Sequence, residues 1–155
     1  MKKSVILIIF AVYILSVCVV GFFGIKVRMY NETVNVESVQ ITLVTYEDGT
    51  KIEIGEDENG NPVARHVCKN AGETVTFKVY YQVNPANATD PSTLLIYDKT
   101  NPKVSVSRVP GEQAVLITFN SVTSSSMLDI TIANHINTSI CDSILLSVIW
   151  NPIEF

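Results

Sequence analysis

The sequence predicts an all-β fold, an antiparallel β-sandwich, preceded by one N-terminal transmembrane helix. Three observations support this prediction. An apolar run without a charged residue occupies positions 5–25, later segments alternate apolar and polar residues with a period of two, and dipeptides typical of tight turns separate those segments. A chain of 155 residues has room for the helix and for one domain of ordinary size.

The apolar run predicts a helix that spans a lipid bilayer. Its 21 residues make a helix about 31 Å long, which matches the hydrocarbon core of a bilayer. Apolar residues surround its whole circumference, whereas a helix on the surface of a soluble protein has a polar face. We therefore expect residues 1–4 to be a cytoplasmic basic n-region, residues 5–25 a signal-anchor helix in contact with lipid, and residues 26–35 a tether.

Two other fates of this leader stay open. Val19-Val20-Gly21 fits a signal-peptidase site, and cleavage there would release a secreted domain. Lys3-Ser4 before Val5 is similar to the prepilin-peptidase junction of archaeal type IV pilins, which implies a filament subunit whose helix packs with its copies. We prefer an uncleaved anchor because the apolar stretch exceeds the roughly 7–15 residues of a signal peptide.

The charges favour a domain outside the cell. Lys2, Lys3 and the free amino terminus face Lys26 and Arg28 across the apolar run, which gives a slight bias toward a cytoplasmic N-terminus. Met29–Phe155 contains 7 basic and 15 acidic residues, a net charge of −8. This charge disfavours contact with anionic lipid headgroups and with nucleic acid. We expect a single-pass protein of the cell membrane with an extracellular β-domain.

Short alternating segments from position 36 onward predict the strands. The clearest is Thr74–Val83, where Val, Phe and Tyr occupy every second position, the signature of a half-buried strand. Turns are expected at Asp48-Gly49, Asn59-Gly60 and Pro110-Gly111. About eight strands at roughly ten-residue spacing predict a sandwich over residues 36–155. The expected strands are Val39–Tyr46, Thr50–Ile54, Val63–Cys68, Thr74–Val83, Leu94–Tyr97, Val104–Val106, Val115–Phe119, Leu128–Ile132 and Ser143–Trp150.

Two segments carry a family resemblance. Ala71–Phe77, with the sequence AGETVTF, and Val109–Glu112 followed by Val115–Phe119 resemble strands of CARDB-type immunoglobulin-like modules from prokaryotic, in particular archaeal, cell surfaces. The resemblance covers residues 36–134. It implies an immunoglobulin-like sandwich with a role in adhesion or display and with no catalytic residues.

The two cysteines of the domain, Cys68 and Cys141, are predicted to form a disulfide, because thiols outside the cell are usually oxidised. The bond would close a loop of 73 residues. A loop of that length stabilises the fold by about 4–5 kcal/mol in the chain-entropy treatment. Two buried, reduced thiols are the alternative if the domain is cytosolic.

His66 and His135 are weak candidates for metal ligands beside those cysteines. Two histidines and two cysteines can ligate zinc or copper, but their spacing here matches neither a zinc finger nor a blue-copper domain. The acidic turn Glu56–Asn61 is a candidate for calcium binding. An EF-hand alignment would put Gly55 and His66 where carboxylates are required, so a solvated turn is expected. We expect no metal and no cofactor.

Three Asn-x-Ser/Thr sequences begin at Asn31, Asn87 and Asn137 and are weak candidates for N-glycosylation. The sequence contains no phosphate-binding glycine loop, no nucleophile elbow and no zinc-protease motif, so we expect no catalytic residue and no enzyme. The predicted function is a non-catalytic adhesion or display sandwich on a membrane anchor, contacting a protein partner or itself through a sheet edge or loops. A pilin-like filament subunit and a secreted ligand- or metal-binding module are the alternatives.

Overall fold

The computed structural model describes residues 2–30 and 33–151, and these form one helix and ten strands. The chain divides into two compact units, Met1–Val34 and Asn35–Phe155. The elements are α1 (Lys2–Tyr30), β1 (Ser38–Tyr46), β2 (Lys51–Ile52), β3 (Ile54–Glu56), β4 (Pro62–Cys68), β5 (Glu73–Asn84), β6 (Thr93–Tyr97), β7 (Val104–Arg108), β8 (Ala114–Val122), β9 (Ser126–Asn134) and β10 (Cys141–Trp150).

The helix α1 makes up the first unit. Its large apolar side chains that the structure describes between Val5 and Val20 are 47–71% exposed. By length and composition, Lys3–Gly21 can cross a membrane, as a membrane anchor or a signal sequence would. The helical backbone continues to Tyr30, through positions that the sequence assigned to the tether. Neither Gly nor Pro interrupts residues 25–30, so nothing in the local sequence ends the helix earlier.

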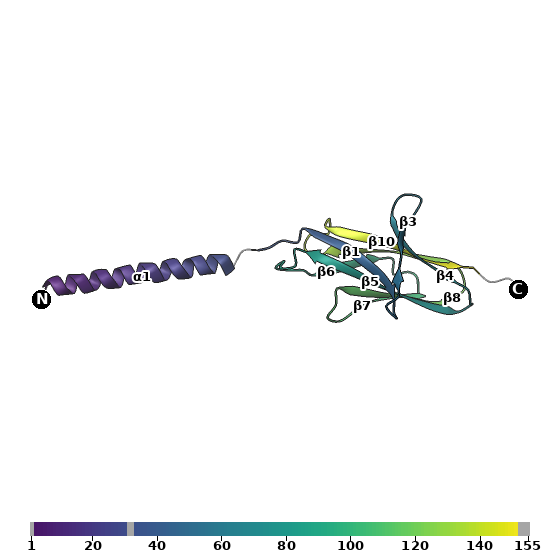
Figure 1. The fold of residues 1–155 in the computed structure, drawn as a ribbon, viewed down its shortest axis with the longest axis horizontal. Helices are drawn as coiled ribbons and strands as arrows, with labels where there is room; N and C mark the ends of the chain where they lie inside the picture. The colour runs from purple at the N-terminus through teal and green to yellow at the C-terminus, as the bar shows by residue number, and fades with distance from the viewer. Residues whose placement is uncertain (1, 31–32, 152–155) are drawn as a thin grey trace. The chain divides into compact units, whose positions relative to one another are not determined.

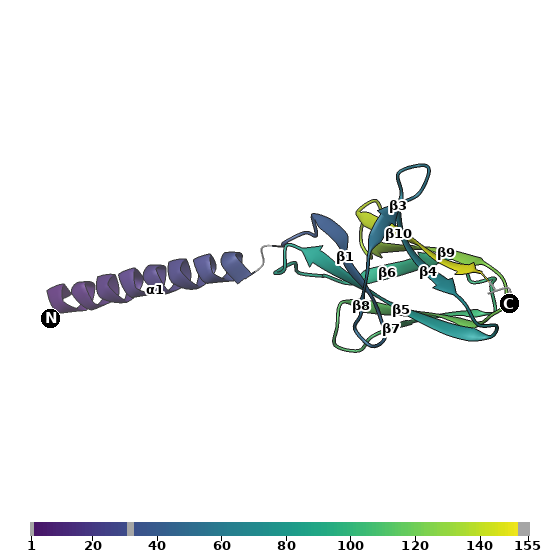
Figure 2. The same cartoon turned by 45° about the vertical axis from the view of Figure 1, so that its right-hand side comes forward.

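The second unit is an immunoglobulin-like β-sandwich of two five-stranded sheets (Figure 1). Sheet A has the strand order β2-β1-β5-β8-β7, and sheet B has the order β3-β4-β10-β9-β6. Figure 2 shows the two layers, with β5 and β7 below β9 and β10. The predicted all-β sandwich with one apolar N-terminal helix is confirmed.

Two details of the sheets differ from the sequence-based expectation. The segment expected as one strand over Thr50–Ile54 divides at Glu53, since β2 pairs in sheet A and β3 in sheet B. Sheet B is also mixed, because β4 and β10 run parallel, with Val63 opposite Leu145. Alternation reveals which residues face the core, but the direction of a neighbouring strand depends on connections elsewhere in the chain.

Apolar side chains from alternate positions of both sheets form the core. On β5 the residues Val75, Phe77 and Val79 are buried while their neighbours are partly exposed, as the period of two predicts. The rings of Phe77 and Phe119 meet edge to face with their centroids 5.8 Å apart, a favoured aromatic geometry. The largest fully buried side chains include Phe77, Phe119, Ile117, Ile130, Ile132, Ile144 and Leu146.

Polar contacts join the two sheets. The backbone N–H of Ile41 on β1 donates to Asp142 Oδ2 on β10 over 2.7 Å. The guanidinium of Arg108 on β7 donates to the hydroxyl of Tyr81 over 3.1 Å and to the side chain and carbonyl of Thr93 on β6. Hydrogen bonds to ionised groups are stronger than neutral ones, so these contacts align the layers.

The predicted disulfide between Cys68 and Cys141 is wrong. Cys68 ends β4 opposite Trp150, the last residue of β10, whereas Cys141 is the first residue of β10. The ten residues of β10 span about 30 Å, and a disulfide requires Cα atoms within about 7 Å. Both thiols are free, Cys68 buried and Cys141 exposed. An oxidising compartment favours disulfides in general, but it does not bring two distant thiols together.

Candidate functional site

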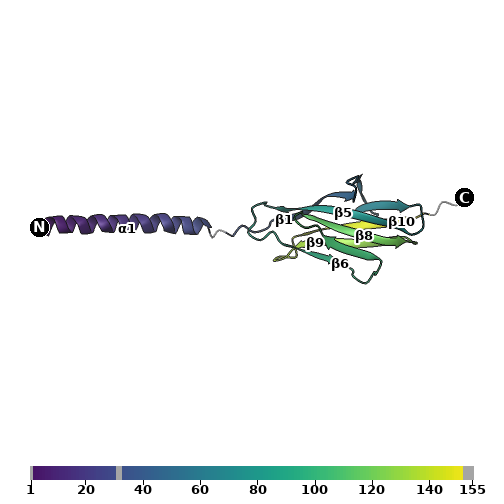
Figure 3. The same cartoon turned by 90° about the horizontal axis from the view of Figure 1, so that it is seen from below.

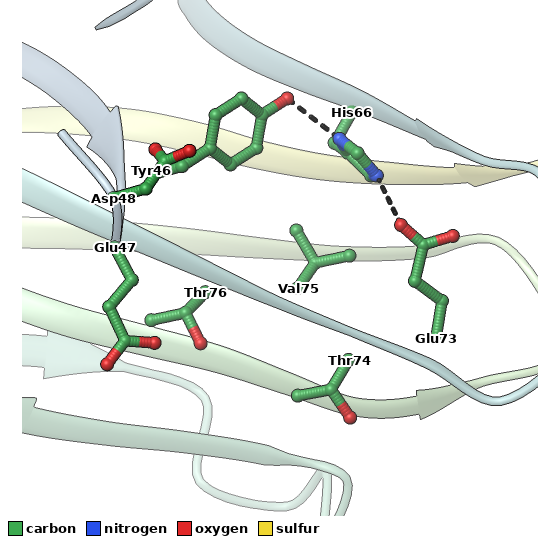
Figure 4. A pocket seen from close by; sticks show the side chains of 8 residues that line it. All are labelled: Tyr46, Glu47, Asp48, His66, Glu73, Thr74, Val75 and Thr76. Atoms are coloured by element: carbon green, nitrogen blue, oxygen red, sulfur yellow. Dashed lines mark hydrogen bonds and ion pairs between the residues drawn. The ribbon is translucent and has the colours of Figure 1, made fainter. Parts of the chain in front are cut away.

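Four polar side chains gather at one end of the sandwich. Tyr46 is the last residue of β1, Glu73 is the first residue of β5, and His66 and Cys68 belong to the end of β4. We call these four residues the end cluster. Because β1 and β5 belong to sheet A and β4 to sheet B, the end cluster joins the two layers. Figure 4 shows three of its members, Tyr46, His66 and Glu73.

Local sequence explains why three of these residues meet. His66 and Cys68 are two positions apart on one strand, so they face the same side of sheet B. The four-residue connection Lys69–Gly72 then takes the chain from sheet B to sheet A. Gly72 adopts a φ of 80°, a left-handed conformation that glycine reaches without steric cost. This turn brings Glu73 next to His66.

Tyr46, His66 and Glu73 form a hydrogen-bonded row (Figure 4). The hydroxyl of Tyr46 lies 2.7 Å from His66 Nδ1, and His66 Nε2 lies 3.2 Å from Glu73 Oε1. In a neutral imidazole, Nδ1 accepts the proton of the Tyr46 hydroxyl and Nε2–H donates to the Glu73 carboxylate. The Tyr46 ring also stacks on Phe77 with a centroid distance of 6.2 Å, which connects the row to the core.

Burial and nearby acids keep two members of the end cluster protonated. Burial, followed by the charges of Asp48, Cys68 and Glu73, raises the pKa of Tyr46. Burial, followed by the charge of Glu73, raises the pKa of the Cys68 thiol. A nucleophile is activated by a lowered pKa, so these directions work against covalent catalysis by either side chain.

A pocket of about 270 Å³ opens beside the row. The side chains of His66 and Glu73 are 21% and 31% exposed, so solvent reaches both, while Cys68 is fully buried. Two further acids, Glu47 and Asp48, line the pocket (Figure 4). Three carboxylates around one opening favour a cation over an anion as its occupant.

Three members of the end cluster have the chemistry and the spacing of metal ligands. His66, Cys68 and Glu73 each offer one donor atom, and these atoms all lie within 4.8 Å of one another. Imidazole nitrogen, thiolate sulfur and carboxylate oxygen are the three donor types that bind zinc in proteins.

The two-histidine, two-cysteine set that the sequence suggested does not come together. His135 follows β9, and its backbone N–H donates to the carbonyl of Ser92 at 3.0 Å. It therefore lies toward the Cys141 end of β10, away from His66 and Cys68. Glu73 and Tyr46 were not among the residues predicted from the sequence. The alternation of His66 and Cys68, followed by a glycine turn and an acidic residue, was the available signal for Glu73.

The other predicted positions lie outside the end cluster. Asn31 is outside the described residues, while Asn87 and Asn137 are exposed on loops, so glycosylation stays a prediction. The acidic turn closes on itself, because Asp57 Oδ1 accepts the backbone N–H groups of Asn59 and Asn61, each at 2.8 Å. These hydrogen bonds lower the pKa of Asp57, as in an ordinary Asx turn.

No protein family and no curated protein matches this chain. A crystal structure of a mutant titin–obscurin-like immunoglobulin complex is similar with a TM-score of 0.40 and 10% identity, covering 75% of this chain and 100% of that chain. The assignment to the sandwich class rests on the strand order and register of this chain. No match supports the resemblance to CARDB modules or to pilins, so both stay predictions.

Proposed function

We propose that this protein is a non-catalytic surface protein, anchored in a membrane by α1, whose sandwich is displayed outside the cell for adhesion. The observation that supports the proposal is the exposure of the apolar side chains in Lys3–Gly21, since none of those that the structure describes is buried. Apolar surface in water costs about 25 cal/mol per Å². A helix that is apolar all round therefore requires lipid or copies of itself as its surroundings.

Charge supports an exterior position for the sandwich. Lys2 and Lys3 precede the apolar run and Lys26 and Arg28 follow it, so the flanking charges favour a cytoplasmic N-terminus only slightly. The net charge of −8 over Met29–Phe155 disfavours close contact with anionic lipid headgroups. Both features fit a domain that stands in solution beyond the membrane surface.

Strand β6 provides the surface that we propose for adhesion. It is one of the two outermost strands of sheet B, next to β9 (Figure 3). Its side chains Leu94 and Ile96 are 38% and 51% exposed. An outermost strand can pair with a strand of another chain, and exposed apolar side chains add contact area to such pairing.

Membrane extraction and protease treatment test the anchor and its orientation. We expect the full chain, tagged at its C-terminus, to stay in the membrane pellet after alkaline carbonate washing. Protease added to intact cells should remove the tag. Release of the full chain by carbonate would contradict anchoring, and a protected tag would contradict display.

N-terminal sequencing of the mature protein separates this proposal from its alternatives. An intact Met1 end, or loss of Met1 alone, supports the anchor. A chain that begins at Val5 would support pilin-like processing, and one that begins at Phe22 would support secretion. Either of these two results would overturn the anchor.

A pair of matched substitutions tests the adhesive edge. Ile96→Lys places a charge on β6, and Met127→Lys places the same charge on β9, where the side chain is 65% exposed. We expect Ile96→Lys to reduce attachment of cells that display the protein, because burying an unpaired charge in an interface is costly. Met127→Lys should leave attachment unchanged. Equal attachment by both variants and the unaltered protein would exclude β6 as the contact surface.

A further inference from the structure

We propose that the end cluster binds a divalent transition-metal ion, with Zn²⁺ as the expected ion, through His66 Nε2, Cys68 Sγ and a carboxylate oxygen of Glu73. This site is independent of membrane anchoring and of the adhesive edge. It adds a ligand to a sandwich for which the sequence predicts none.

The spacing of the donor atoms is close to that of a tetrahedral site. Zn–N and Zn–O bonds of about 2.0–2.2 Å and a Zn–S bond of about 2.3 Å place neighbouring donors about 3.4–3.6 Å apart. His66 Nε2 and Glu73 Oε1 are already 3.2 Å apart, and no pair among the three donors exceeds 4.8 Å. The donor atoms need to approach one another by only about 1 Å to reach this spacing. The Glu73 side chain is 31% exposed and has room to move.

The charges of the donors suit a divalent ion. A Cys68 thiolate and a Glu73 carboxylate together carry the two negative charges that neutralise M²⁺, and His66 binds as a neutral ligand. Metal binding breaks the S–H bond of Cys68, forms the metal–sulfur bond and releases one proton to solvent. No electron is transferred. Thiolate sulfur selects a borderline-soft ion such as Zn²⁺ over Ca²⁺ or Mg²⁺, which prefer oxygen ligands.

Tyr46 would act on the metal through His66. When Nε2 binds the ion, the remaining imidazole proton must be on Nδ1, which lies 2.7 Å from the Tyr46 hydroxyl. The hydroxyl then accepts this N–H instead of donating to Nδ1. Such a partner fixes the tautomer and the ring orientation of a metal-binding histidine. Tyr46 is therefore a positioning residue and not a ligand.

Three protein ligands leave a fourth position for water or an external ligand. The pocket of about 270 Å³ beside His66 and Glu73 provides space for such a group. Its acidic lining includes Glu47 and Asp48, which attract the incoming cation. A site of this kind is open and exchangeable, unlike a closed structural zinc site with four protein ligands.

Cobalt binding to the full chain tests the proposal directly. The protein is purified in detergent, reduced, stripped with a chelator and titrated with Co²⁺ as a spectroscopic substitute for Zn²⁺. We expect saturation at one equivalent, a thiolate-to-cobalt charge-transfer band in the near ultraviolet, and the intense visible bands of four-coordinate Co²⁺. Zn²⁺ should remove both sets of bands. Absence of the charge-transfer band would overturn the proposal.

Matched variants identify which thiol and which histidine bind. Cys68→Ser should abolish the charge-transfer band and His66→Gln should weaken binding at least tenfold. Cys141→Ser and His135→Gln change the same residue types at the other end of the domain and should bind as the unaltered protein does. Loss of the band in Cys141→Ser, or its survival in Cys68→Ser, would contradict the assignment.

Two milder substitutions, Glu73→Gln and Tyr46→Phe, test the proposal even if Cys68→Ser does not fold. Glu73→Gln removes a ligand whose side chain is 31% exposed, so the fold should survive while binding weakens. Tyr46→Phe keeps the ring but removes the partner of Nδ1, and should weaken binding by about 10–100-fold while the charge-transfer band remains at saturation. Unchanged affinity in both variants would show that the row has only a structural role.

Discussion

An engineered disulfide between β9 and β10 tests the strand register that separates the two native cysteines. Ala133 lies directly opposite Cys141 on the neighbouring antiparallel strand. Opposed residues on such strands have Cα atoms about 4.5–5.5 Å apart, within the range of about 4.4–6.8 Å that disulfides adopt. Ala133→Cys should therefore form a disulfide with Cys141, while Cys68 stays reduced.

The size of the effect follows from the short loop that the new bond closes. Cys141 lies eight residues after position 133. A loop of that length stabilises the fold by about 2–3 kcal/mol in the chain-entropy treatment. With a urea dependence of about 1–3 kcal/mol per M, the unfolding midpoint should rise by about 0.7–3 M on oxidation. Reduction should reverse the rise.

Peptide mass spectrometry and urea unfolding measure the two parts of this prediction. Ala133→Ser serves as the control because it changes the same position without adding a thiol. The oxidised variant should yield a peptide linked between positions 133 and 141, and the unaltered protein should yield no peptide linked between Cys68 and Cys141. A native Cys68–Cys141 link would refute the register and, with it, the location of the end cluster.

Three further predictions concern the core, the helix and a turn. Ile117→Ala changes a side chain with 0% exposure and should lower the free energy of unfolding in urea by about 2–5 kcal/mol. Ile96→Ala changes a side chain with 51% exposure and should lower it by about 0.5 kcal/mol. Equal losses would contradict the faces assigned to these two side chains. Ile14→Arg should weaken membrane insertion by about 3–4 kcal/mol and increase carbonate extraction, while Ile14→Leu should behave as the unaltered protein. Backbone hydrogen bonds lower the pKa of Asp57 below its ordinary value of 3.8. The ionised carboxylate therefore contributes its full stabilisation above pH 3.8, and this contribution is lost as the pH falls through the lower pKa of the folded state. We therefore expect the free energy of unfolding in urea to fall less between pH 7 and acid pH in Asp57→Asn than in the unaltered protein. An equal fall in both proteins would exclude this contribution of Asp57.

Local patterns were sufficient to predict most of the strands. Thr74–Val83 alternates so regularly that its inward residues, among them Phe77, could be assigned before any neighbour was known. The turn at Asp48-Gly49 was predictable for the same local reason, since the left-handed φ of 86° at Gly49 suits glycine. These features depend on side chains and backbone angles within a few residues.

Contacts between distant segments could not be predicted in this way. The sequence placed Cys68 and Cys141 together on a chemical argument, but the parallel pairing of β4 with β10 puts them at opposite ends of a ten-residue strand. The same pairing separates His66 from His135. Only the three-dimensional arrangement brings Tyr46 of sheet A next to His66 of sheet B, with oxygen and nitrogen 2.7 Å apart.

Composition and local pattern were enough to predict the apolar helix, the strand periodicity and the acidic charge of the domain, because none of them depends on contacts between distant residues. The packed fold was needed to show which thiol is buried, which histidine meets a carboxylate, and which strands form open edges. Those outcomes depend on sheet order and strand direction, which arise from packing two whole sheets against each other. The end cluster is therefore a product of the fold and not of a motif.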